Sequence, residues 1–506
     1  MIDDASEWRE ILSLSLAAIP GLEIQTASSV DEAWKALLLH EYDLVTVDIS
    51  LVAIVTPSAV INRGGFEILQ RLRSEQASVD PALFVVSVHA DMKHVMEAFD
   101  EYSVDAFFDK TGFPREAFVA RARKAILASL VRTAERRVRR RCGVTISMSN
   151  DRFVSAELTG PVRKGSYYLD AAFDGAGFAA RADALNLRIE KGTSRVWPDE
   201  ARTIGRELYQ TLMKQPNLAE VLIRGGDFTS RQDPTVIQFT GNAPALGVPF
   251  ELLTDGSDYL CFEQIIVRRL ATDGLRPTQK GEPFHEFVAT LAQTRQPLRV
   301  LLIAANTDGK IPHVDRELAE VRSHLENALK ALGIEPLIHD VRGKDATYEN
   351  CRKLLQSGRY HIVHYAGHGE YDKHSPESSG IVLTTGARTR SLTAAQLKLL
   401  VGGSDLRLAF FSCCVSAATA QQVGKGDFHG TLDGVVRGDV PITIGYRWNV
   451  SDLGARTFAQ TFYKELFASL SPGMALLRSR RAAADHAGGR QKPLWASAVM
   501  VCQTEP

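Results

Sequence analysis

The stretches His361-Ile-Val-His-Tyr-Ala-Gly-His368-Gly369 and Leu408-Ala-Phe-Phe-Ser-Cys-Cys414 each run through apolar residues and reach a chemically reactive side chain. Short apolar runs of this kind predict buried strands of a parallel sheet. Active sites of such sheets lie at the carboxyl ends of the strands. A thiol needs a base to become a thiolate at neutral pH, and imidazole suits that task. The sequence therefore indicates His368 and Cys414 as a candidate catalytic pair.

Helical and strand-like segments alternate on both sides of this pair, which predicts an α/β fold with a doubly wound sheet. The preceding residues, 143–290, mix strand-like runs with a helix and are interpreted as a supporting subdomain. Around the pair itself, apolar runs predict strands at 298–305, from 440 onward and at 496–502, and helical spacing predicts helices at 317–329, 455–470 and 471–484.

The composition is that of an ordinary soluble globular protein. At 506 residues the chain exceeds what one hydrophobic core serves, so two or three domains are expected. The net charge of −1 gives no general attraction to nucleic acid or to an anionic membrane. No apolar run approaches the ~20 residues that span a bilayer, and the start lacks a signal-peptide pattern. Six cysteines without framework spacing indicate free thiols, so we expect a cytoplasmic protein with no membrane partner.

The first 128 residues also alternate helix and strand patterns, which predicts a separate parallel sheet. The predicted strands end on polar residues: the acidic pair Asp3 and Asp4, then Asp48, Ser87 and Lys110. Because the carboxyl ends of parallel strands meet at one edge, we expect these side chains to converge. Carboxylate oxygens suit Mg²⁺, and a hydroxyl with a lysine would hold a phosphoryl group beside it.

This arrangement resembles the receiver domain of bacterial response regulators, which has a flavodoxin-like fold. The resemblance implies a phosphorelay, with a histidine kinase or another activating protein as partner. The sequence departs from the family in two places, because the first strand is almost missing and the segment 51–63 is longer than usual. A degenerate receiver that only binds partners is the alternative. The residues implied are Asp48 as phosphoacceptor, Asp3, Asp4 and Asp48 as Mg²⁺ ligands, Ser87 as switch hydroxyl, Phe107 as switch aromatic and Lys110 as phosphate contact.

A basic helix is predicted between the two parts of the chain. Apolar positions at helical spacing begin at Glu116, and the pattern continues through the arginine-rich segment 132–141 toward Gly143. Nucleic-acid binding is not favoured, because the segment lacks interleaved aromatics and any recognised motif. We interpret residues 129–142 as a solvated linker helix that transmits a signal and could contact an acidic partner or, in a homodimer, a second copy of the chain.

Four motifs mark the rest of the chain: the strand with His368-Gly369, Ser412-Cys413-Cys414, Tyr446-Arg-Trp-Asn-Val-Ser-Asp452 and Val248-Pro-Phe-Glu-Leu-Leu253. Together they resemble the CHAT family of bacterial caspase-like cysteine peptidases, relatives of caspases and separase. The resemblance implies a caspase-like α/β sandwich at 295–506, preceded by the supporting α/β subdomain at 143–294. The family's nucleophile usually follows an alanine. Here Cys413 occupies the alanine position, so Cys414 is the match.

The resemblance implies a mechanism that needs no metal or other cofactor. Cys414 would attack the scissile carbonyl, and His368 would protonate the leaving amine. Backbone N–H groups of Gly369 and Cys414 would stabilise the oxyanion. Asp452 matches an acidic position of the pocket for the residue before the cut, and Trp448 belongs to the same loop.

Other interpretations of these residues are weaker. His364 and His368 would share a face with a metal ion on a helix, but the apolar run around them favours a strand. A lone buried cysteine is usually a small hydrophobe, whereas the joint histidine and cysteine pattern favours a dyad. We therefore expect a regulated cysteine endopeptidase that cleaves a partner protein, is gated by the receiver-like domain, and acts in bacterial signalling, defence or cell death. The alternative is a non-proteolytic adaptor in which both modules are binding platforms.

Overall fold

The computed structural model of the chain contains two compact units. The smaller unit comprises Met1–Val138 with Val288–Gln296 and Glu326–Glu335, and the larger unit comprises the other segments from Arg139 to Pro506. The structure describes residues 1–51, 54–56, 59–61, 64–73, 79–89, 91–149, 151–160, 164–190, 197–227, 229–230, 233–242, 246–271, 281–370, 372, 375, 378–386, 388–413, 431–486 and 488–506.

The smaller unit is built on a parallel sheet whose central strand, β4, is buried at all six of its residues. This full burial matches the uninterrupted apolar run that predicted the strand. The sheet order is β1 (Leu44–Val47), β4 (Ala82–Ser87) and β5 (Ala106–Asp109), and the surrounding helices are α1 (Ser6–Leu16), α2 (Val30–Leu39), α3 (Gly64–Leu72) and α4 (Met92–Tyr102).

The segment before the acidic pair is reduced to a single bridging residue, Ile2, which pairs on both sides. Ile2 bridges in parallel to Val47 and to Ala27. Its N–H donates to the Thr46 carbonyl at 2.9 Å, and the Asp3 N–H donates to the Ala27 carbonyl at 3.1 Å. The acidic pair therefore follows a paired residue, and the first strand is almost missing, as the sequence indicated.

The longer segment after Asp48 contains a small antiparallel pair, β2 (Ile54–Thr56) and β3 (Ala59–Ile61). The chain then returns close to the acceptor strand at Gly65. A Cβ atom at Gly65 would lie 2.3 Å from the Asp48 carbonyl oxygen, so only glycine fits at this position.

A single helix, α5 (Arg115–Arg140), covers most of the predicted linker. The linker part is not solvated on all sides, because Leu130, Ala134 and Arg137 are buried. The helix ends at Arg140, and Gly143 begins the next strand instead of terminating the helix.

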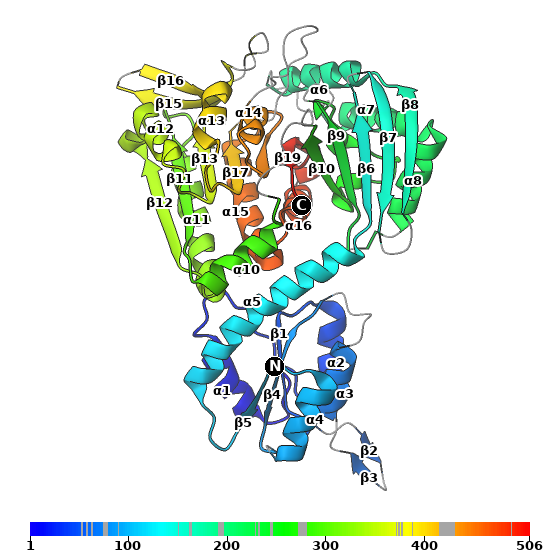
Figure 1. The fold of residues 1–506 in the computed structure, drawn as a ribbon, viewed down its shortest axis with the longest axis vertical. Helices are drawn as coiled ribbons and strands as arrows, with labels where there is room; N and C mark the ends of the chain where they lie inside the picture. The colour runs from blue at the N-terminus through cyan, green and yellow to red at the C-terminus, as the bar shows by residue number, and fades with distance from the viewer. Residues whose placement is uncertain are drawn as a thin grey trace. The chain divides into compact units, whose positions relative to one another are not determined.

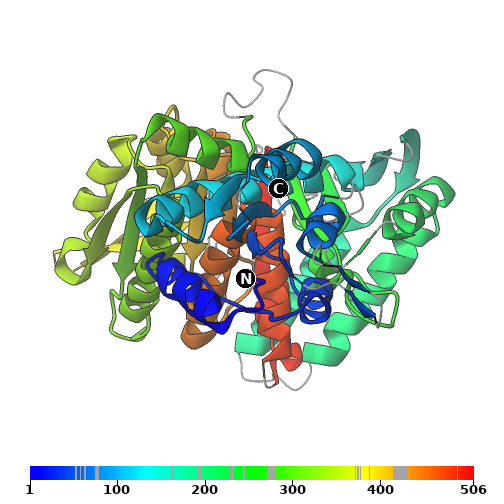
Figure 2. The ribbon, with the colours of Figure 1, turned by 90° about the horizontal axis from the view of Figure 1, so that it is seen from below.

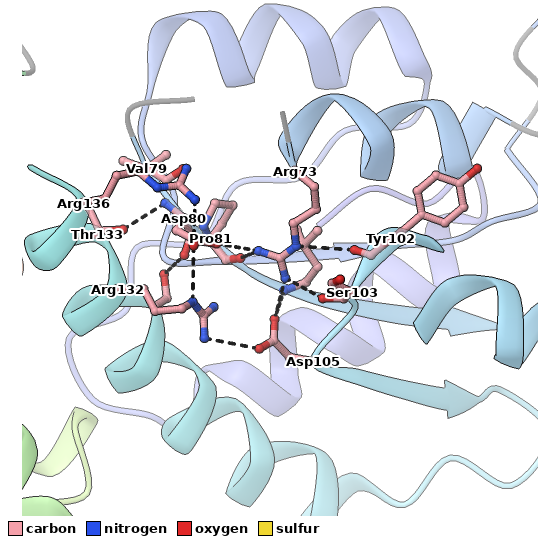
Figure 3. A network of polar contacts seen from close by, with 12 residues as sticks. Arg73, Val79, Asp80, Pro81, Tyr102, Ser103, Asp105, Arg132, Thr133 and Arg136 are labelled. Atoms are coloured by element: carbon pink, nitrogen blue, oxygen red, sulfur yellow. Dashed lines mark hydrogen bonds and ion pairs between the residues drawn. The ribbon is translucent and has the colours of Figure 1, made fainter. Parts of the chain in front are cut away.

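Figure 3 shows a polar network that joins α5 to the start of β4 and β5. Asp80 is its centre, because Arg73 donates to its Oδ1 at 2.6 Å and Arg136 donates to its Oδ2 at 2.9 Å. Asp105 forms a second branch, with Arg73 at 3.0 Å and Arg132 at 3.5 Å. These partly buried ion pairs are screened less than exposed ones, so they hold the second half of α5 against the sheet.

The larger unit is built on one extensive sheet, and Figure 1 shows its strands from the edge strand β12 to the other edge strand, β8. Eleven described strands follow one another in the order β12-β11-β13-β17-β18-β19-β10-β9-β6-β7-β8. In chain order their bounds are β6 (Gly143–Met148), β7 (Arg152–Thr159), β8 (Gly165–Ala172), β9 (Val236–Gly241), β10 (Ile265–Leu270), β11 (Leu298–Ala305), β12 (Pro336–Arg342), β13 (Ile362–Gly367), β17 (Leu408–Ser412), β18 (Ile442–Tyr446) and β19 (Ala498–Cys502).

The last strand, β19, joins the two halves of this sheet. It pairs antiparallel with β18 and parallel with β10. The supporting strands and the strands that carry the candidate site therefore belong to one hydrogen-bonded layer, because the carboxyl-terminal strand is inserted between them.

Helices cover this sheet, and α16, coloured red in Figures 1 and 2, contacts β10 and β19. No helix within the described ranges has the length and apolar character needed to cross a membrane.

A smaller sheet contains β14 (Gly369–Glu370), β15 (Gly380–Thr385) and β16 (Arg388–Thr393). The remaining described α-helices of the chain, of which α10 and α11 have residues in both units, are α6 (Gly175–Glu190), α7 (Trp197–Met213), α8 (Pro216–Asp227), α10 (Phe284–Thr294), α11 (Val314–Ala331), α12 (Tyr348–Gln356), α13 (Ala394–Val401), α14 (Thr431–Arg437), α15 (Asp452–Ser469), α16 (Pro472–Asp485) and α17 (Leu494–Ser497).

A buried charge network holds the Val248–Leu253 motif against the sheet. Glu251, Arg268 and Arg480 are almost completely buried. Arg268 donates to Glu251 Oε2 at 2.8 Å, and Arg480 donates to Glu251 Oε1 at 3.3 Å. Burial by itself would raise the pKa of Glu251, but the guanidinium groups outweigh it and hold that pKa below its ordinary value.

Candidate active site

His368 directly follows β13, and β13 lies beside β17 in parallel. Ala366 pairs with Ser412 in this register. His368 comes two residues after Ala366, and Cys414 comes two residues after Ser412 in the sequence. Cys414 itself lies outside the described residues, and with it the predicted oxyanion contribution of its N–H group.

The neighbouring thiol, Cys413, is described and lies in the hydrophobic core of the larger unit. Only 3% of its surface is exposed. Such a thiol is packed as a small apolar side chain, which is the behaviour of structural cysteines.

The backbone of His368 is held in place by the neighbouring sheet. Its carbonyl oxygen accepts the Val382 N–H at 3.0 Å and the Tyr365 hydroxyl at 2.8 Å. Gly367 has no room for a side chain, because a Cβ atom would lie 2.4 Å from the Tyr365 hydroxyl oxygen. The next residue, Gly369, begins β14 and pairs with Ile381. The short segment from 367 to 369 is therefore fixed on both sides.

The imidazole of His368 contacts Asp308, a residue that the sequence did not single out. His368 Nε2 lies 2.7 Å from Asp308 Oδ1, and about a third of each side chain is exposed. Asp308 follows β11, which is the other parallel neighbour of β13. A hydrogen bond from the Lys310 N–H, together with the bond to His368, lowers the pKa of Asp308 to about 2.

The two predicted pocket residues follow β18, the strand next to β17. Asp452 is the first residue of α15, and its Oδ2 accepts the His313 N–H at 2.8 Å. Trp448 is only 1% exposed, and its ring meets that of Trp197 edge to face at 4.9 Å between centroids. The structure thus brings Asp452 to the loop after β11, whereas it encloses the Trp448 ring in the core.

The other histidines of the first motif are separated from His368. His364 is buried, and its Nε2 lies 2.9 Å from Glu317 Oε1. His361 is also buried, and its Nδ1 accepts the Arg299 N–H at 3.2 Å. Their positions on and beside a strand explain why they do not converge with His368.

The predicted receiver residues do converge at one sheet edge. Lys110 donates to Asp48 Oδ2 at 2.6 Å and lies 2.7 Å from Asp3 Oδ2. The Ser87 hydroxyl donates to Asp48 Oδ1 at 2.8 Å. Ser50, which the sequence analysis did not single out, also donates to Asp48 Oδ1 through its N–H and its hydroxyl, each at 2.9 Å.

Burial and these contacts together shift the pKa values of Asp48 and Asp3 in opposite directions. For Asp48, burial by itself would raise the pKa, but Lys110 and the hydrogen bonds from Ser50 and Ser87 outweigh it and lower the pKa. For Asp3, burial prevails over the bond to Lys110 and raises the pKa.

The receiver edge has the donor set for a divalent cation. Asp3, Asp4 and Asp48 each offer a carboxylate oxygen, and these oxygens lie within 4.8 Å of one another. Hard oxygen ligands of this kind fit Mg²⁺. Phe107, the predicted switch aromatic, lies on β5 and is partly buried against the core of the smaller unit.

Comparisons with known proteins agree with this architecture. Residues 202–503 match the CHAT domain, and residues 1–122 match the response regulator receiver domain. The fold and these matches define a protein that joins a receiver domain to a CHAT domain with an α/β fold. The chain belongs to the CHAT family, because that match covers more than half of its length. No curated protein matches the chain.

The solved structures that are similar to this chain include a cysteine proteinase and a separase. The Arg specific cysteine proteinase gingipain R is 12% identical, with a TM-score of 0.39 over 57% of this chain and 67% of that chain. Separase in the Saccharomyces cerevisiae separase–securin complex is 13% identical, with a TM-score of 0.42 over 75% of this chain. The match spans only 31% of the separase chain.

Proposed function

We propose that this chain is a cysteine endopeptidase that cleaves partner proteins with Cys414 as nucleophile and His368 as its acid and base. The register of β13 and β17 is the observation that supports this most. It pairs Ala366 with Ser412, and the two candidate groups follow these residues at the same spacing. The burial of Cys413 also supports Cys414 as the thiol that meets substrate.

The chemistry needs only these two side chains and nearby N–H groups. The Cys414 thiolate attacks the scissile carbonyl carbon, and the oxyanion that forms is stabilised by backbone N–H groups of Gly369 and Cys414. Protonated His368 then donates its proton to the leaving amine as the C–N bond breaks. Water, deprotonated by His368, next cleaves the thioester and restores the free thiol.

The proposal is tested by incubating the purified full-length protein with a peptide library and mapping the cuts by mass spectrometry. Cys414→Ala and His368→Ala should abolish cleavage, because an unassisted thiol is only a few per cent thiolate at neutral pH. Cys413→Ala is the matched control, and it should keep most of the activity. Cleavage that survives in Cys414→Ala, or that requires Cys413 instead, would overturn the assignment. Absence of any cleavage by the wild type would favour the adaptor alternative.

The receiver domain is proposed to regulate this activity. Phosphorylation of Asp48 would add about two negative charges beside Lys110 and Ser87. Both groups already contact Asp48, so they are positioned to respond. The continuous helix α5 forms ion pairs with Asp80 and Asp105, and β6 follows it closely in the chain. These features support a route by which a change at Asp48, or a partner bound at the same surface, biases the peptidase.

A further inference from the structure

We propose that Asp308 is the positioning residue of the dyad, which orients the His368 ring and fixes the ring nitrogen that serves Cys414. This inference deepens the proposed peptidase function and rests on it. It arises from a contact between residues 60 positions apart in the chain, His368 Nε2 and Asp308 Oδ1 at 2.7 Å.

The contact determines which nitrogen is available for the thiol. A carboxylate only accepts hydrogen bonds, so the Nε2 that faces Asp308 carries a proton. The neutral ring then has its lone pair on Nδ1. Nδ1 is therefore the atom that takes the proton from Cys414 and later delivers it to the leaving amine.

Asp308 is itself held before any substrate binds. Its Oδ1 also accepts the Lys310 N–H at 3.0 Å, and Gly309 between them has a φ of +74° that favours glycine. The Lys310 ammonium lies 3.3 Å from Oδ2. This closed turn directs the carboxylate toward the ring, so the ring need not be reoriented during the reaction.

The loop that carries Asp308 is anchored at both of its ends. The loop begins directly after β11. The last residue of that strand, Ala305, pairs with Gly367, which directly precedes His368. The far end of the loop is held by Asp452, which accepts the His313 N–H at 2.8 Å. The Asn306 side chain closes the loop internally by accepting the Ile311 N–H at 3.3 Å. The separation of Asp308 and His368 is thus set by the sheet and by α15.

The carboxylate also assists the reaction by its charge. When Cys414 loses its proton, His368 becomes an imidazolium, and a negative group at 2.7 Å stabilises that positive charge. The low pKa of Asp308, about 2, keeps this group ionised at neutral pH. The buried pair of His364 and Glu317 differs, because neither side chain reaches the surface.

The test uses iodoacetamide, which reports thiolate formation without any knowledge of the substrate. The other five cysteines are buried, so rapid modification of the full-length protein should occur at Cys414, as mapped by mass spectrometry. Asp308→Asn should slow this reaction by about tenfold, because the amide keeps the shape but removes the charge. Asp308→Glu should restore most of the rate. Asp315→Asn, which alters an exposed carboxylate at the start of α11, is the control and should react like the wild type.

A cleavage assay separates this inference from the function on which it rests. With a peptide found by the library, Asp308→Asn should lower kcat while KM stays within about twofold, since Asp308 touches the base and not the substrate. Wild-type rates of alkylation and cleavage in Asp308→Asn, with Cys414→Ala inactive, would overturn the role of Asp308 and leave the peptidase intact. Undiminished cleavage by Cys414→Ala would instead overturn the peptidase assignment itself.

Discussion

Asp452 and His313 lie 139 residues apart in the chain and are joined by a 2.8 Å hydrogen bond from the His313 N–H to Asp452 Oδ2. Asp452 thereby links the start of α15 to the loop that follows β11. One carboxylate oxygen has this structural role, and the side chain is only partly buried. The same carboxylate is therefore able both to anchor the loop and to receive a positive charge.

We predict a preference for Lys or Arg before the cut, because a basic side chain would neutralise the Asp452 carboxylate in the pocket. Asp452→Asn keeps an oxygen that can accept the His313 N–H but loses the charge. It should therefore reduce cleavage after basic residues by about tenfold while apolar sites change little. Cleavage-site profiles of the two proteins measure this difference. A wild-type profile dominated by apolar residues would assign Asp452 to loop anchoring alone.

We predict that the receiver domain restrains the peptidase. A shortened chain that begins at Gly143 should cleave peptides at a different rate from the full-length protein, with higher activity as the expected direction. A phosphoryl mimic should change the rate of the full-length protein and leave Asp48→Ala unchanged.

The network around Asp80 offers a sharper test of the same coupling. Asp80→Ala removes the acceptor that Arg73 and Arg136 share but leaves Asp48 and Lys110 in place. It should weaken the response to the mimic without changing the phosphoryl site. Equal rates for the full-length and shortened chains, with or without mimic, would contradict regulation and leave the receiver as a tether.

We predict that Mg²⁺ binds at the receiver edge. Titration calorimetry of the full-length protein should detect one site, which Asp48→Asn removes and Asp4→Asn weakens, because both supply carboxylate oxygens. Asp109→Asn is the matched control. Asp109 is exposed at the end of β5 and hydrogen-bonds Thr111. Binding that is insensitive to Asp48 and Asp4 would place the cation elsewhere.

We predict that Glu251→Ala strongly destabilises the larger unit. The change leaves Arg268 and Arg480 buried without their carboxylate, and such a loss costs about 3–5 kcal/mol. Glu207→Ala breaks the exposed pair with Arg181 and should cost about 1 kcal/mol or less. Urea unfolding of the two variants gives the comparison, and similar free energies would show that the buried network adds little.

The same glutamate makes the unit sensitive to acid. Its pKa is lowered in the folded chain, so its contribution is fully present above its unfolded pKa of about 4.5 and is lost as the pH falls through the lower folded value. The free energy of unfolding should therefore drop below pH ~4.5, and less steeply in Glu251→Gln. An equal slope in both proteins would contradict this sign.

The sequence by itself determined the local elements and the principal site residues. Apolar runs predicted β4, β11, β13 and β17, because buried parallel strands need apolar side chains on both faces. The polar residues at strand ends indicated the Asp48 and Lys110 edge, which the structure brings together. They also indicated His368, because a reactive group at the end of an apolar strand is a local feature.

Only the tertiary structure decided which distant groups meet. Asp308 follows an expected strand and precedes Gly309, but nothing local shows that its carboxylate faces a histidine 60 residues away. Glu251 and Arg480 meet across 229 residues, and β19 joins two halves that the sequence presents as separate. The physical reason is that strand and helix patterns arise from neighbours along the chain, whereas strand order and ion pairing depend on how the whole sheet is assembled.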